Sequence, residues 1–126
     1  MSGKRTHGFT LIELLVVLAI VAMLLSIVAP RYIHKTEQAK ETVLREQLAS
    51  LRTAIDYHYG DHGEYPPSLQ ALVDGKYLRK IPVDPVTGRD DTWQVTMQEL
   101  RGVRGVYDVH SGAAGNGRDG TPYAGW

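Results

Sequence analysis

The sequence contains no cysteine, so neither a disulfide nor a cysteine-ligated metal site can stabilise this chain. Its 126 residues are enough for one small globular domain. A domain of this size has a small core, and it usually gains stability from a long helix, a metal, disulfides or neighbouring molecules. With disulfides excluded, a long helix, a metal held by other ligands and neighbouring molecules remain.

The chain also lacks an excess of charge of either sign. It has 14 lysine and arginine residues against 14 aspartate and glutamate residues. Proteins that bind nucleic acids usually carry a basic stripe or patch, so we expect no nucleic-acid partner. The sequence has no nucleophile elbow, phosphate-binding loop or His-Glu-x-x-His motif either. We therefore predict that the chain is not an enzyme.

A long apolar run near the start is the strongest feature of the sequence. Residues 9–29 read FTLIELLVVLAIVAMLLSIVA, and Glu13 is the one charged residue among these 21. About 20 such residues are needed to span a membrane as a helix. Because Lys4 and Arg5 precede the run, the N-terminus should lie in the cytoplasm and everything after Pro30 on the far side. A secretory signal peptide would have a shorter run followed by a small-x-small cleavage site.

Glu13 is unusual within this run. A carboxylate in an apolar helix costs about 2.5 to 3.5 kcal/mol on insertion scales, and such residues usually have a partner and a function. A glutamate this close to the end of the run is also compatible with a place among the lipid headgroups. Position alone does not separate these two interpretations.

The string GFTLIELLVVLAI, residues 8–20, resembles the signal sequence of type IV pilins and pseudopilins. In that family a short basic leader ends in glycine, and a prepilin peptidase cleaves after it and methylates the new N-terminus. The resemblance implies that Met1–Gly8 is the leader and that mature Phe9 carries the methylated amine. It also implies that Glu13 pairs with the Phe9 amine of a neighbouring subunit during assembly. A buried charge without its partner is strongly destabilising, so this pair would fix the register of assembly.

Pro30 lies where many members of the family have a helix-kinking proline. Proline removes one backbone hydrogen bond, and in filaments of the family this region is often extended. We therefore predict bending or melting at Pro30 and a part for this proline in assembly. Residues 9–30 would form the transmembrane and filament-core helix.

An amphipathic continuation of the helix is predicted over residues 31–59. Apolar or aromatic positions recur at steps of three and four, which marks one helical face. These positions are Leu44, Leu48, Leu51, Ile55 and His58, and the stripe is widened by Val43 and Ala54. Gly60 is expected to end the helix. The apolar face should pack under the C-terminal domain.

Residues 60–126 are predicted to form the remainder of a small domain. The expected elements are a short helix capped by Ser68, a turn at Asp84–Gly88, strands over Trp93–Glu99 and Val106–His110 joined around residues 100–105, and an irregular C-terminal loop ending at Trp126. The fold class is therefore α+β and type IV pilin-like: a long N-terminal helix, transmembrane in its first half, packed on a small antiparallel sheet. Residues 31–126 would be the periplasmic domain.

The order of segments after the helix resembles the major pseudopilins of type II secretion systems. The shared segments are GEYPPSLQALV, GKYLRKIPVDPVTG, a strand starting at Trp93 and GVYDVHSGAAGNGRDG. Major pilins usually close their C-terminal loop with a disulfide, which this chain cannot form. The resemblance implies a periplasmic filament that helps move folded proteins across the outer membrane. Its implied partners are further copies, minor pseudopilins, the prepilin peptidase, and an inner-membrane platform with a cytoplasmic ATPase.

Two alternatives to this function remain open at the level of sequence. The chain could be a pilin of a surface pilus or of a DNA-uptake filament. It could also be a membrane-anchored periplasmic domain that never polymerises, and an uncleaved N-terminus would favour that interpretation.

Major pseudopilins commonly bind calcium in the C-terminal loop, so the resemblance implies a calcium site that would use Asp119, Asp108 and Ser111. Calcium takes six to eight oxygen ligands, several of them carboxylates. Asp119 is the single carboxylate between Ser111 and Trp126, and Arg118 stands beside it. The alternative is a loop held by hydrogen bonds and by packing of Trp126.

His58 and His62 have the i, i+4 spacing of some zinc sites. Gly60 stands between them and is expected to end the helix, and no third ligand is obvious. Structural or surface histidines are the favoured interpretation.

Overall fold

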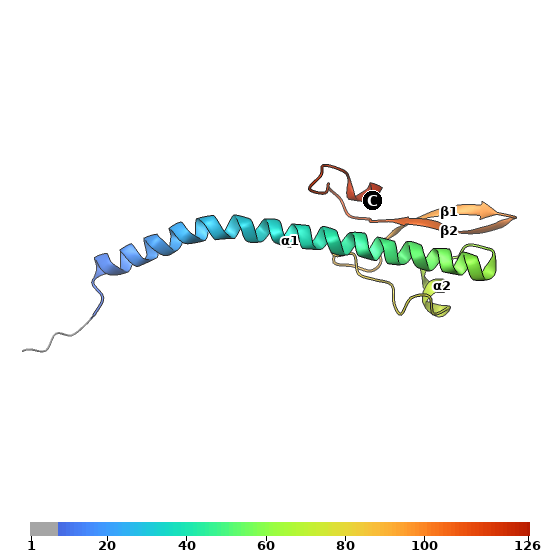
Figure 1. The fold of residues 1–126 in the computed structure, drawn as a ribbon, viewed down its shortest axis with the longest axis horizontal. Coiled ribbons are helices and arrows are strands. Elements are labelled where there is room, and N and C mark those ends of the chain that lie inside the picture. The colour runs from blue at the N-terminus through green and yellow to red at the C-terminus, as the bar shows by residue number, and fades with distance from the viewer. Residues whose placement is uncertain (1–7) are drawn as a thin grey trace, which may run out of the picture. The chain divides into compact units, whose positions relative to one another are not determined.

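The computed structural model describes residues 8–126, and the chain divides into two compact units, Met1–Glu37 and Gln38–Trp126. The elements are α1 (Leu11–His62), α2 (Leu69–Asp74), β1 (Gln94–Leu100), β2 (Val103–His110) and the 3-10 helix η1 (Tyr123–Gly125) (Figure 1). One long helix and a two-stranded antiparallel sheet confirm the predicted α+β class.

The first unit consists of the N-terminal part of α1 and the residues before it. Every large apolar side chain between Phe9 and Val28 is at least 45% exposed. The Ser26 hydroxyl donates to the Met23 carbonyl at 2.7 Å, so the helix itself satisfies this polar group. Among the described residues of this unit, no apolar side chain has a core of its own chain to pack into.

By length and composition, α1 can cross a membrane. Its most apolar window of 18 residues has a mean hydropathy of 3.0, as predicted for residues 9–30. The helix continues through Pro30, so of the predicted bending or melting at this proline, the backbone does not melt in the single chain. A proline removes one hydrogen bond of the ladder, and the neighbouring turns still hold the helical backbone. The part of Pro30 in bending and assembly stays a prediction.

The second unit has a core that runs along one face of α1. The buried residues are Leu44, Leu48, Leu51, Ala54 and Ile55 from α1, Leu72 from α2, and Trp93, Val106 and Val109 from the hairpin region. Figure 1 shows the hairpin and α2 on opposite sides of this part of α1. The predicted stripe is thus confirmed at its centre. At its edge the prediction is confirmed for Ala54, which is 3% exposed, and wrong for Val43, which is 39% exposed.

The end of α1 differs from the sequence prediction. Gly60 lies within the helix, and the helix ends at His62. Gly63 follows with φ +72, and its N–H donates to the Tyr59 carbonyl at 2.8 Å. A glycine with positive φ after the last helical residue is a common C-terminal cap. Gly63 is therefore the capping glycine that was assigned to Gly60.

The hairpin is longer than predicted because its turn is tighter. Leu100 pairs with Val103, which leaves Arg101 and Gly102 as a two-residue turn with φ of 53 and 81. Two positive φ values are typical of the type I′ turn that suits the twist of paired strands. Strand β2 therefore begins at Val103 instead of Val106.

Two short segments of the second unit follow the prediction. Ser68 caps α2 by accepting a hydrogen bond from the Ala71 N–H at 3.2 Å. The turn at Asp84–Gly88 is closed by a bond of 2.8 Å from the Gly88 N–H to the Asp84 carbonyl. The Asp84 carboxylate is fully buried, and it accepts hydrogen bonds from the Val86 N–H at 2.8 Å and the Ser111 hydroxyl at 2.5 Å.

Candidate processing and assembly site

The first turn of α1 is closed by a reciprocal pair of hydrogen bonds. The Glu13 N–H donates to the Thr10 hydroxyl at 3.1 Å, and the Thr10 N–H donates to the Glu13 carboxylate at 3.4 Å. This arrangement is a capping box, in which each side chain satisfies a backbone donor that the helix leaves unpaired. The Glu13 carboxylate therefore has a partner within its own chain.

The position of Glu13 also suits its charge. It lies in the first turn of α1, where the positive end of the helix dipole stabilises an anion. Its neighbours Leu11 and Ile12 are 80% and 74% exposed. A carboxylate is thus held at the edge of an apolar surface, next to the residue that would become the N-terminus after cleavage.

Gly8 and Phe9 precede this turn. No atom lies within 4 Å of a Cβ placed on Gly8, and Phe9 is 81% exposed. Both residues are open to an approaching enzyme. The other residues of the predicted leader, with Lys4 and Arg5, lie outside the described residues, so cleavage after Gly8 stays a prediction.

The three candidate calcium ligands contact different groups of the protein. Asp108 pairs with Arg52 at 3.0 Å. Asp119 accepts a hydrogen bond from the Thr121 hydroxyl at 2.6 Å, and Ser111 donates to buried Asp84. Within residues 8–126, no three acidic or histidine side chains are grouped so as to hold a metal ion.

His58 and His62 lie together on α1, because the helix does not end between them. Their ring centroids are 4.4 Å apart. A ring nitrogen of His58 lies 3.0 Å from the Glu64 carbonyl, and one of His62 lies 3.3 Å from the Tyr77 hydroxyl. The Tyr77 hydroxyl in turn donates to Asp61 at 2.6 Å. Through Tyr77, these contacts join the segment after α2 to the end of α1. They agree with the interpretation of both histidines as structural or surface residues.

Comparison with known proteins places these features in a family. The model of the prokaryotic N-terminal methylation motif matches residues 3–29. The type II secretion system core protein G of Pseudomonas aeruginosa is 33% identical over 95% of this chain and 91% of its own length. The protein of the same name from Pectobacterium carotovorum is 33% identical over 96% of this chain and 81% of its own length. The chain belongs to the family of type II secretion system core protein G, the major pseudopilins.

Two further comparisons qualify this membership. The fimbrial protein EcpC of Eikenella corrodens is 28% identical over 96% of this chain and 82% of its own length, so the family likeness extends to fimbrial proteins. No solved structure matches the chain significantly. The pseudopilin family is thus established by sequence along nearly the whole chain.

Thr10 is a residue of the candidate site that the sequence analysis did not single out, and it caps the first turn of α1 through Glu13. The motif Thr-x-x-Glu at residues 10–13 was present in the sequence and is the signature of a capping box. The family resemblance drew attention to the charge of Glu13 and to a partner in another subunit. The local partner of the same carboxylate follows from the capping-box motif alone.

Proposed function

We propose that the chain is a structural subunit of the pseudopilus of a type II protein secretion system and not an enzyme. Residues 9–30 anchor it in the inner membrane with the N-terminus in the cytoplasm, and the second unit lies in the periplasm. After cleavage behind Gly8, subunits leave the membrane and polymerise into a periplasmic filament that helps move folded proteins across the outer membrane.

The observation that carries this proposal is the exposed apolar surface of α1 ahead of Pro30. Its large side chains are all at least 45% exposed, and so large an apolar patch marks contact with a membrane or with other proteins. Lipid can cover it in the anchored subunit, and the same part of other subunits can cover it in a filament. The family membership supports the filament in addition to the membrane-anchored subunit.

Glu13 gives the filament its register in this proposal. In the single chain its carboxylate is held by the Thr10 N–H at 3.4 Å, a long hydrogen bond. A methylated Phe9 amine from a neighbour would form a stronger, charge-assisted bond. Leaving such a buried charge unpaired costs roughly 3 to 5 kcal/mol, so a subunit in the wrong register would be rejected.

The expected partners follow from the same proposal. They are further copies of the chain, minor pseudopilins, the prepilin peptidase and an inner-membrane platform driven by a cytoplasmic ATPase. The net charge of the chain is zero, so nucleic acid is not an expected partner, because its binding depends largely on attraction between basic residues and phosphates.

The test is complementation of native cells from which the chain has been deleted. Wild type should restore both periplasmic filaments and secretion of extracellular proteins. Glu13→Leu should insert into the membrane normally, but filament yield should fall by roughly 100-fold or more, because the neighbour's amine loses its partner. Glu37→Leu is the matched control, since Glu37 is an exposed acid of the same unit outside the apolar run, and it should behave as wild type.

Two results would contradict the proposal. Normal filament yield from Glu13→Leu would remove the register role of Glu13. Surface filaments together with secretion that does not depend on the chain would favour the pilin alternative, to which the fimbrial relative points.

A further inference from the structure

Three side chains of α1 hold the C-terminal segment, which we define as residues 111–126. They are Glu41, Arg45 and Arg52, and we call them the α1 latch. Glu41 and Arg45 are one helical turn apart, and Arg52 follows two turns later, so all three lie along one face of the helix. Each contacts the C-terminal segment through a different group.

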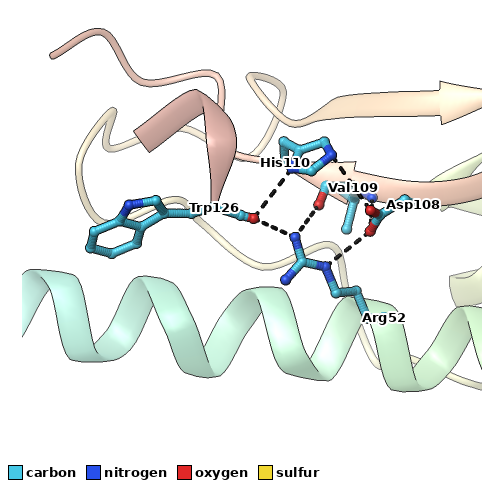
Figure 2. Close-up of polar contacts among 5 residues, drawn as sticks. All are labelled: Arg52, Asp108, Val109, His110 and Trp126. Atoms are coloured by element: carbon cyan, nitrogen blue, oxygen red, sulfur yellow. Dashed lines mark hydrogen bonds and ion pairs between the residues drawn. The ribbon is translucent and has the colours of Figure 1, made fainter. Parts of the chain in front are cut away.

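Arg52 bridges β2 and the end of the segment. Its Nε donates to Asp108 Oδ1 at 3.0 Å, and its terminal nitrogen donates to the Val109 carbonyl at 2.9 Å. The same nitrogen donates to the backbone oxygen of Trp126, which also lies 3.2 Å from Nδ1 of His110. Figure 2 shows the guanidinium between these acceptors. Charge-assisted bonds of this kind are about twice as strong as neutral ones.

Arg45 contacts the segment at two further points. Its guanidinium lies 3.9 Å from the centre of the Trp126 ring, a distance at which a cation is attracted to the face of the ring. A terminal nitrogen lies 3.6 Å from Asp119 Oδ2. The Thr121 hydroxyl and N–H donate to the other oxygen of this carboxylate. The Thr121 hydroxyl lowers the pKa of Asp119 most, and Arg45 lowers it further, so the carboxylate is charged at neutral pH.

Glu41 completes the latch on the side of the glycine-rich turn. Its Oε1 accepts a hydrogen bond of 2.7 Å from the Arg118 N–H and one of 3.2 Å from the Tyr123 hydroxyl. The segment is thus bound at four residues in its second half, Arg118, Asp119, Tyr123 and Trp126. Glu41 supplies the acceptor, and the two arginines supply the donors.

These contacts occupy the groups that a calcium ion in this region would need. Asp108 Oδ1 accepts hydrogen bonds from Arg52 and from the Val109 N–H. Asp119 is held by Thr121 and Arg45. Calcium requires six to eight oxygen ligands with several carboxylates, and here each carboxylate already faces a guanidinium cation. The residues present do not fit the calcium site that the resemblance implied.

We propose that the C-terminal segment closes on α1 through the α1 latch and without a metal ion. The arginines neutralise Asp108 and Asp119, which is the electrostatic task that a bound cation would perform. The fold of the second unit should then be independent of calcium. This inference concerns the stability of the single chain and stands apart from its assembly into a filament.

The test is hydrogen exchange of the purified full-length chain in detergent micelles, in excess calcium and in excess EGTA. The readout is the exchange rate of the backbone amides of residues 117–126, followed by mass spectrometry of the C-terminal peptide. In the wild type these rates and the melting temperature should be the same in both buffers. In Arg52→Met the amides should exchange at least tenfold faster in both buffers, because bonds to a charged group contribute about 1.5 to 3 kcal/mol.

Arg79→Met is the matched control. Arg79 is exposed and has no hydrogen bond or ion pair to another side chain among the described residues, so its variant should exchange as the wild type does. Should Arg52→Met fail to fold, Glu41→Gln removes one charged acceptor at the exposed rim and should still speed exchange of the Arg118 amide. Slower exchange or a higher melting temperature of the wild type in calcium would overturn the proposal. Unchanged exchange in both variants would overturn it as well.

Discussion

The two parts of α1 share one helical backbone but differ in where their partners lie. Between Phe9 and Val28 every large apolar side chain is at least 45% exposed, whereas Leu44, Leu48, Leu51 and Ile55 are at most 2% exposed. An apolar surface has to be covered to be stable in water. The second part is covered by its own chain, and the first must be covered from outside the chain, which is the place that the proposed function gives to lipid and to other subunits. The second part of α1 therefore determines the stability of the single chain, and the first part is the surface available for contacts outside it.

Polar groups follow the same division. In the first part they bond within one turn, as Thr10 does with Glu13 and Ser26 with the Met23 carbonyl. In the second part some of them bond locally, as Thr42 does with the Gln38 carbonyl, and others bond over long distances in sequence, as Arg52 does with Asp108. Short-range bonds leave the first part free to change its surroundings without losing its own hydrogen bonds.

The largest expected effect comes from truncating one leucine in each part. Leu48→Ala should destabilise the second unit by about 2 to 5 kcal/mol, because it opens a cavity in the core. Leu18→Ala should leave this free energy of unfolding unchanged, since Leu18 is 55% exposed. Urea unfolding of the full chain in micelles, followed by the fluorescence of buried Trp93, measures both. Equal losses of unfolding free energy in the two variants would contradict the difference between the two parts of α1.

A smaller effect is expected at the buried carboxylate of the second unit. Asp84→Ala leaves the buried Ser111 hydroxyl and the half-buried Val86 N–H without their acceptor. A buried donor without a partner costs about 1 to 3 kcal/mol, so we expect a loss of about 3 kcal/mol in urea unfolding. Exposed Asp90→Ala serves as the control and should change little. A neutral result for Asp84→Ala would mean that the turn is held by other contacts.

Loss of the capping box should weaken the first part alone. Thr10→Val removes the hydroxyl that accepts from the Glu13 N–H, and the loss of an N-cap costs about 1 kcal/mol. The Glu13 amide should then exchange about fivefold faster in micelles, while unfolding of the second unit stays the same. Thr53→Val replaces an exposed threonine within α1 and should leave the Glu13 amide unaffected.

Comparably small effects, of opposite sign, are expected at two glycines at the end of α1. Gly60→Ala should stabilise the second unit by about 0.8 to 1 kcal/mol, because Gly60 is helical with open space around it. Gly63→Ala should destabilise it by about 1 to 2 kcal/mol, because φ is +72 there. Thermal unfolding of both variants measures the difference. A destabilising Gly60→Ala together with a stabilising Gly63→Ala would restore Gly60 as the cap.

The sequence predicted those features that depend on local pattern. The buried stripe of α1 was predicted because a helix repeats every 3.6 residues, and Leu44, Leu48, Leu51 and Ile55 fit that period. The apolar run and the Gly8–Phe9 motif are also contained in one short stretch of sequence, so they could be recognised without the fold. The end of α1 was missed because two glycines competed for the cap, and a helical glycine costs only about 1 kcal/mol relative to alanine.

The α1 latch could not be predicted from the sequence. Arg52 and Asp108 are separated by 56 positions, and charged residues at such distances have many alternative partners. The resemblance suggested instead that Asp108, Asp119 and Ser111 would share a cation. The structure engages each of them with a different group of the protein, and only the folded chain reveals which arginine faces which carboxylate.

The central claim is that this chain becomes a filament subunit by losing its leader. Mass spectrometry of the N-terminal peptide, from cells with and without the prepilin peptidase, tests it most directly. A peptide that begins at Phe9 with one added methyl group, found only with the peptidase and absent in Gly8→Val, is the predicted result. An intact leader in both cells would contradict the claim and would leave an anchored periplasmic domain that does not polymerise.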